Sequence, residues 1–148
     1  MKKYLIILFL LLSSLVHSQE FDYNIYTGMT KKEITKSFKN DEFKYKIYAK
    51  LYVDIDSVGT WKLSDSVYTL LIYYNEDTKV LFTFDYKTNK CVKYYVIMNN
   101  LDNYWNYYDY YNRVYTKIGA RDWKYDKNII SLRIISSNQI TLFVEIKK

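Results

Sequence analysis

The fold is decided by residues 67–98, whose sequence is VYTLLIYYNEDTKVLFTFDYKTNKCVKYYVIM. Val67 to Tyr74 is apolar at almost every position, which is typical of a central strand covered on both faces. Polar segments separate this run from Lys79–Tyr86 and from Cys91–Met98, and Asn89 suits the left-handed conformation of a tight turn. In the second run, one face carries Val80, Phe82, Phe84 and Tyr86. The segment predicts three consecutive antiparallel strands.

Period-two alternation extends on both sides of this segment. Lys44 to Ile55 places Tyr45, Ile47, Ala49, Leu51, Val53 and Ile55 on one face, which predicts a long strand with one buried face. Trp61–Leu63 begins another strand. Three more are expected at Trp123–Tyr125, Ile129–Ile135 and Ile140–Ile146. Their inward positions are Ile130, Leu132, Ile134, Ile140, Leu142, Val144 and Ile146.

A first helix is predicted at Lys31–Phe38, ending within residues 39–41. Thr30 and Glu33 have the spacing of a capping box, in which each residue's side chain accepts a hydrogen bond from the other's backbone N–H. Met29 and Ile34 flank the cap at positions that form a hydrophobic staple.

A second, amphipathic helix is predicted at about 101–118, before Gly119. Its apolar arc comprises Leu101, Tyr104, Trp105, Tyr107, Tyr108, Tyr111, Val114, Tyr115 and Ile118. Tyr110 falls on the polar arc with Asp109 and Arg113. The run of tyrosines is therefore interpreted as the buried face of a helix.

These elements predict an α+β fold in which two helices pack on one face of a mainly antiparallel sheet. We expect a single domain at 19–148, because no linker-like segment divides it. Residues 61–72 match residues 123–134 at both Trp-Lys pairs and at several strand positions. This similarity indicates either a tandem repeat of halves 26–98 and 99–148, or chance likeness between strands of similar composition.

Residues 1–18 have the features of a signal peptide. Lys2 and Lys3 precede a short apolar run, and Val16 and Ser18 occupy the −3 and −1 positions of a cleavage site after Ser18. The sequence predicts a periplasmic or secreted protein without stable membrane insertion.

Composition argues against several functions. Subtracting Lys2 and Lys3 from 22 basic residues leaves 20 against 16 acidic ones, a net charge of about +4 without the basic stripe that nucleic-acid binding needs. His17 leaves with the signal peptide, and Cys91 is the one cysteine. No catalytic dyad, metal site or cofactor is therefore expected.

Two acidic arrangements remain as alternatives. Residues 54–65 resemble a calcium loop, with Asp54, Asp56 and Gly59 in place, but Val58 occupies a ligand position, so a solvated loop between strands is favoured. A hydrolase built on paired carboxylates stays open, because such pairing is spatial.

The 19 tyrosines indicate either an aromatic binding surface or the codon bias of an AT-rich genome, and the second interpretation is favoured. The wet face of the Lys44–Ile55 strand is the candidate binding surface, comprising Lys46, Tyr48, Lys50 and Tyr52. Alternating lysine and tyrosine suits an acidic or aromatic protein surface, or a glycan. Lysines that protect an edge strand from aggregation are the favoured alternative.

The segment Gly28-Met29-Thr30-x-x-Glu33-Ile34, followed by a Trp strand and antiparallel strands, resembles the superfamily of β-lactamase-inhibitor protein and the small lipoprotein of the outer-membrane β-barrel assembly machine. The resemblance implies a protein-binding surface in the cell envelope. The chain departs from that pattern in having neither proline nor a lipid-bearing cysteine. The function expected is an exported, non-enzymatic protein-binding module with an envelope or extracellular partner. A small-ligand or glycan-binding protein using exposed tyrosines is the alternative.

Overall fold

The computed structural model describes residues 24–38, 46–73 and 77–147, so the predicted signal peptide and the predicted helix end at 39–41 lie outside it. Within these ranges the chain forms an α+β fold rich in antiparallel strands. The elements are α2 (Lys31–Phe38), β1 (Lys46–Leu51), β2 (Val53–Ile55), β3 (Trp61–Leu63), β4 (Val67–Tyr73), β5 (Thr78–Asp85), β6 (Cys91–Met98), α3 (Asn103–Val114), β7 (Thr116–Lys117), β8 (Asp122–Tyr125), β9 (Asn128–Ser136) and β10 (Gln139–Ile146).

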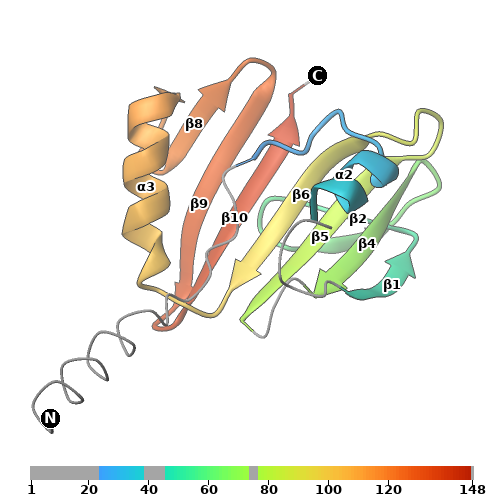
Figure 1. Cartoon of the computed structure of the whole chain (residues 1–148), viewed down its shortest axis with the longest axis horizontal. Coiled ribbons are helices and arrows are strands. Elements are labelled where there is room, and N and C mark those ends of the chain that lie inside the picture. The colour runs from blue at the N-terminus through green and yellow to red at the C-terminus, as the bar shows by residue number, and fades with distance from the viewer. Residues whose placement is uncertain (1–23, 39–45, 74–76, 148) are drawn as a thin grey trace, which may run out of the picture.

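Eight of these strands form one antiparallel sheet in the order β1-β4-β5-β6-β10-β9-β8-β7 (Figure 1). The remaining two, β2 and β3, form a separate two-stranded ribbon. The prediction of three consecutive antiparallel strands in residues 67–98 is confirmed, since β4 pairs with β5 and β5 pairs with β6. No helix in the described ranges is long and apolar enough to cross a membrane.

The sheet has two halves that meet where β6 pairs with β10. Strands β1, β4, β5 and β6 lie on one side of this seam, and β10, β9, β8 and β7 lie on the other. The matched sequence segments do not occupy equivalent places in these halves. Trp61 lies in β3 outside the main sheet, whereas Trp123 lies in β8 within it. The repeat therefore stays a prediction, supported by the order of elements and not by that match.

Two hydrophobic cores form on the alternating positions of the strands. The larger core joins Ile34 of α2 and three tyrosines of α3 to residues such as Phe82 and Val96 of the sheet. The smaller core comprises Ile55, Leu81, Tyr95 and Phe143. Neighbouring residues of a strand point to opposite faces, so Phe82 points into the larger core and Leu81 points to the other face of the sheet. The ribbon residue Ile55 covers that other face.

The capping box at the start of α2 is confirmed. The backbone N–H of Thr30 donates to Glu33 Oε2 at 2.7 Å, and the backbone N–H of Glu33 donates to Thr30 Oγ1 at 3.3 Å. The hydrogen bond from the Thr30 backbone is the main reason that the pKa of Glu33 is lowered. Ile34 is buried and Met29 packs against the same core, as a hydrophobic staple requires.

Replacing Thr30 with alanine should destabilise the fold by about 1 kcal/mol, because one capping hydrogen bond to the helix is lost. Urea unfolding of Thr30→Ala measures this change. Lys32→Ala, an exposed position in the same helix, is the control and should shift the free energy of unfolding by less than about 0.5 kcal/mol. An equal effect of the two substitutions would contradict the capping role.

Helix α3 is shorter than the sequence predicts, ending at Val114 instead of near residue 118. Tyr115 is extended at φ −121° and ψ 159°, because the chain turns there into β7. Tyr104, Tyr107 and Tyr111 are buried as predicted. The buried face of the helix is nevertheless narrower than the predicted apolar arc, because Trp105 is 64% exposed and Val114 and Ile118 are also exposed.

The predicted polar position of Tyr110 and the predicted inward position of Ile134 need correction. Tyr110 is partly buried and packs against the larger core, because its ring meets those of Tyr111 and Tyr115. Ile134 is 41% exposed, because it lies near the tip of the β9–β10 hairpin, where residues 134–138 are all exposed.

Tyr107→Ala should reduce the free energy of unfolding by about 3–5 kcal/mol, since it removes a fully buried ring from the larger core. Trp105→Ala, two positions earlier, should cost about 1 kcal/mol, because its ring is 64% exposed and makes T-shaped contacts with the rings of Tyr104 and Tyr108. Urea unfolding compares the two variants. A larger loss for Trp105→Ala would show that the buried face of α3 is assigned incorrectly.

Candidate functional site

The structure brings Lys50 and Tyr52, two of the predicted site residues, together with two further tyrosines. The Lys50 Nζ atom lies 4.4 Å from the ring centroid of Tyr68, 5.4 Å from that of Tyr52 and 5.9 Å from that of Tyr86. These distances fall within the range of a cation–π interaction, in which the ring face attracts a cation. We call Lys50, Tyr52, Tyr68 and Tyr86 the lysine–tyrosine cluster.

Two rings of this cluster are open to a partner, and the third is fixed. Tyr52 is 53% exposed and Tyr86 is 51% exposed, with their rings stacked at a centroid distance of 6.4 Å. Tyr68 is buried, and its hydroxyl donates a hydrogen bond to Asn89 Oδ1. Burial raises the pKa of Tyr68, so its hydroxyl stays protonated and keeps its hydrogen bond to Asn89.

The turn after β5 positions Tyr86. The Asp85 carboxylate accepts hydrogen bonds from the backbone N–H groups of Lys87 and Thr88 at 3.0 and 2.7 Å. Asn89 has φ 56°, the left-handed conformation predicted for it. The Tyr86 N–H also donates to the carbonyl of Ser66 at 2.8 Å. The backbone that carries this exposed ring is therefore fixed at several points.

The predicted four-residue face does not form as one surface. Lys46 pairs with Tyr73 of β4, whereas Lys50 pairs with Leu70, and residues three apart on β4 lie on opposite faces. The cause is a register shift between Ile47 and Ala49 that leaves Tyr48 as the extra residue of a β-bulge. The side chains of Lys46 and Tyr48 are not among those that the structure describes.

The predicted long strand Lys44–Ile55 is wrong, because the segment is divided between β1 and β2. The chain leaves the main sheet at Tyr52, and β2 continues into the ribbon with β3. β1 is an edge strand of the main sheet, the situation in which lysines protect against aggregation. Both interpretations of Lys50, binding and edge protection, are compatible with this position.

The ribbon also carries exposed apolar side chains. The Ser64 N–H donates to the carbonyl of Tyr52 at 3.1 Å, which places the end of β3 beside Tyr52. On β3, Leu63 is 92% exposed and Trp61 is 50% exposed. Exposed Trp and Tyr side chains next to a cation are typical of protein-binding surfaces.

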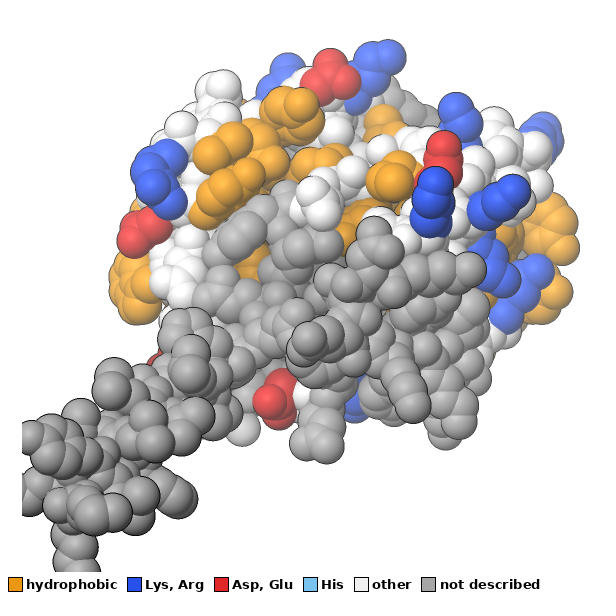
Figure 2. Space-filling model, viewed as in Figure 1, with side chains coloured by type: hydrophobic (Ala, Val, Ile, Leu, Met, Phe, Trp, Pro, Cys, Tyr) orange, Lys and Arg blue, Asp and Glu red, His pale blue; other side chains and the backbone are white. Residues whose placement is uncertain are grey.

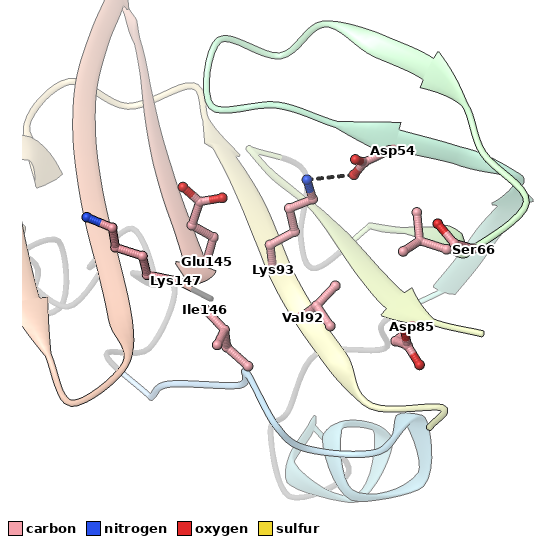
Figure 3. Close-up of a pocket in the computed structure, with 9 residues that line it drawn as sticks. Asp54, Ser66, Asp85, Val92, Lys93, Glu145, Ile146 and Lys147 are labelled. Carbon is pink, nitrogen blue, oxygen red and sulfur yellow. Dashed lines mark ion pairs between the residues drawn. The ribbon is translucent and has the colours of Figure 1, made fainter. Parts of the chain in front are cut away.

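A polar cleft of about 450 Å³ lies between the ribbon and strands β5, β6 and β10 (Figure 3). Lys93 and Glu145 are cross-strand neighbours on β6 and β10, and their side chains project toward the ribbon. Lys93 Nζ forms an ion pair with Asp54 Oδ1 at 2.6 Å, and this oxygen accepts no aligned hydrogen bond. The ion pair ties the ribbon to the main sheet.

The carboxylates of this cleft are mostly committed to structure. Asp54 is in the ion pair, and Asp85 accepts the hydrogen bonds of its turn. Glu145 remains, but a single carboxylate does not provide the acid and base pair of a glycoside hydrolase. The cleft therefore gives no support to the hydrolase alternative.

Two other chemistry-bearing features of the sequence also have structural explanations. Asp56 Oδ1 accepts the N–H groups of Val58 and Thr60 at 3.0 and 2.8 Å, and the Thr60 bond is the main cause of a lowered Asp56 pKa. Burial raises the pKa of the Cys91 thiol, which keeps it protonated. Across the described ranges, no three His, Cys, Asp or Glu side chains gather as metal ligands would.

A second cleft of about 580 Å³ lies between the end of α3, the turn after β8 and residues 24–27. Tyr110, Tyr115 and Tyr125 line it, and we call it the tyrosine cleft. Ring centroids of Tyr115 and Tyr125 are 4.9 Å apart, and those of Tyr110 and Tyr115 are 6.1 Å apart. Figure 2 shows hydrophobic side chains gathered beside α3, over β8 and β9. The sequence predicts Tyr110 on the polar arc of the helix, Tyr115 on its apolar arc and Tyr125 on a strand, and no sequence pattern indicates that the three meet.

Comparison of the chain with known protein families, curated proteins and solved structures gave no match.

Raising the pH should destabilise the fold through Tyr115. Burial, with the nearby Tyr110 and Tyr125 hydroxyls, raises the pKa of Tyr115 from 10.0 to about 12. Between these values the unfolded chain loses a proton that the folded chain keeps, so stability falls as the pH rises. Urea unfolding at about pH 9 and about pH 11 should show a smaller loss for Tyr115→Phe than for the wild type. Equal losses would contradict this role of Tyr115.

Proposed function

We propose that the chain is an exported, non-enzymatic module of the bacterial envelope or secretome that binds a protein partner. In this proposal the lysine–tyrosine cluster contacts an acidic segment of the partner. The predicted signal peptide at 1–18 would direct the chain to the periplasm or outside the cell. The resemblance of the Gly28–Ile34 segment to an envelope superfamily of binding proteins supports the same assignment.

The observation that carries the proposal is the Lys50 ammonium group beside two half-exposed tyrosine rings. An acidic side chain of a partner would pair with Lys50 while Tyr52 and Tyr86 exclude water from that pair. Charges are attracted more strongly where water is excluded. Trp61 and Leu63 on the adjoining ribbon add apolar area that a protein partner, more than a small molecule, would cover.

The fold supports this role by holding the cluster on a rigid edge. We infer that both helices cover one face of the sheet, because Ile34 and the buried tyrosines of α3 share the larger core. The ribbon occupies part of the other face through the smaller core. β1 has a sheet neighbour, β4, on one side, so its other edge adjoins the surface where a partner would dock.

Affinity capture from a bacterial envelope extract, followed by binding measurements with the purified partner, tests the proposal. Lys50→Glu should weaken binding by about tenfold or more, because it reverses the charge facing an acidic segment. Lys50→Arg should keep most of the affinity. Binding should also weaken with added salt, since the pair lies near the surface.

Lys124→Glu is the matched control, because Lys124 is an exposed lysine on β8 in the other half of the sheet. It makes the same change of net charge away from the cluster. Loss of binding with Lys124→Glu equal to that with Lys50→Glu would contradict a specific surface at the cluster. Unchanged binding with Lys50→Glu would contradict it as well.

A further inference from the structure

We propose that the tyrosine cleft is a second binding site, and that its ligand is a neutral oligosaccharide. The cleft lies at the end of α3, on elements separate from the lysine–tyrosine cluster. Its volume of about 580 Å³ is within the range of clefts that bind a small ligand. The chemistry of its lining determines the class of ligand.

The aromatic part of the lining suits the C–H faces of sugar rings. Tyr115 and Tyr125 lie close together, and Tyr110 stands nearly perpendicular to Tyr115 at 84°. Tyr125 is 50% exposed, so a ligand has access to it. A tyrosine ring offers apolar area and a hydroxyl at one end, which matches a ligand that alternates C–H and O–H groups.

The polar part of the lining suits the hydroxyl groups of the same ligand. Asn24, Asp126 and Asn128 line the cleft beside the tyrosines. Amide and carboxylate groups can donate to or accept from sugar hydroxyls. Asp126 is exposed, so a sugar hydroxyl can donate to its carboxylate, whereas a hydrocarbon ligand would displace water from that carboxylate without replacing its hydrogen bonds. A polar ligand is therefore favoured.

One of these polar side chains is held in position before a ligand arrives, and a tight turn sets the backbone of another. Asn128 is buried, and its Oδ1 accepts a hydrogen bond from the Thr27 hydroxyl. Asp126 has φ 53° in the short turn between Tyr125, the last residue of β8, and Asn128, the first residue of β9, which pair with each other. Groups that are already ordered lose less entropy on binding.

Charge restricts the ligand and the chemistry further. Among the described residues of the lining, Asp126 is charged and none is a lysine or arginine, so an acidic sugar would be repelled. One carboxylate does not make the pair that cleaves a glycosidic bond. The lining therefore supports binding of a neutral sugar chain without hydrolysis.

Titration calorimetry of the full chain with neutral gluco-, xylo- and manno-oligosaccharides tests the proposal, with oligogalacturonate as the acidic comparison. At least one neutral oligosaccharide should bind, and oligogalacturonate should not. Tyr125→Ala should weaken binding about tenfold, as expected for loss of one stacking ring. Val114→Trp should also block the site, because Val114 is an exposed residue of the lining and its replacement is large.

Tyr52→Ala is the matched control, since Tyr52 is 53% exposed and belongs to the lysine–tyrosine cluster. It should leave sugar binding unchanged, so the result is independent of the protein-binding proposal. If no neutral oligosaccharide binds, or if neither Tyr125→Ala nor Val114→Trp weakens binding, the proposal is overturned. Loss of binding with Tyr52→Ala instead would place the sugar at the cluster and likewise overturn it.

Discussion

The rest of the structure depends on the pairing of β6 with β10. Val96 faces Leu142 across this ladder and contributes to the larger core, whereas Tyr95 faces Phe143 and contributes to the smaller one. The same ladder therefore joins the two halves of the sheet and the cores on its two faces. The chain has no disulfide to link the halves, because it contains one cysteine. Each candidate binding surface lies in a different half, so this seam also fixes their relative positions.

Sequence predicted the elements whose signals are local. β6 and α2 have the predicted bounds, because their apolar runs end at turn or capping residues that bond within the same segment. The long strand at Lys44–Ile55 was wrong because the alternation of apolar residues continues past Tyr52, where the chain leaves the main sheet for the ribbon. The predicted four-residue face was wrong for another reason. A single extra residue at Tyr48 moves every later side chain to the other face, and nothing in the pattern of apolar residues marks that position.

The candidate sites were less predictable than the elements, since they join residues distant in sequence. Lys50 and Tyr52 were selected from one strand, but Tyr68 and Tyr86 join them only through β4 and the turn after β5. The tyrosine cleft combines residues 24–27 with α3 and a hairpin turn about 100 positions away. Periodicity shows which face a residue takes, but not which element meets that face. The tyrosine excess is consequently divided between core and surface, as at Tyr107 and Tyr125.

Cys91 gives the protein a built-in reporter of its own opening. Its thiol is buried within β6, donates to the carbonyl of Lys93 at 3.3 Å, and lies in the larger core. A thiol reagent in solution can reach the Cys91 thiol only when the residues of the larger core that cover it separate from this part of the sheet. The rate of labelling at Cys91 thus follows the opening of the central strands, without an introduced probe. Because no second thiol is present in the chain, the signal comes from this one site.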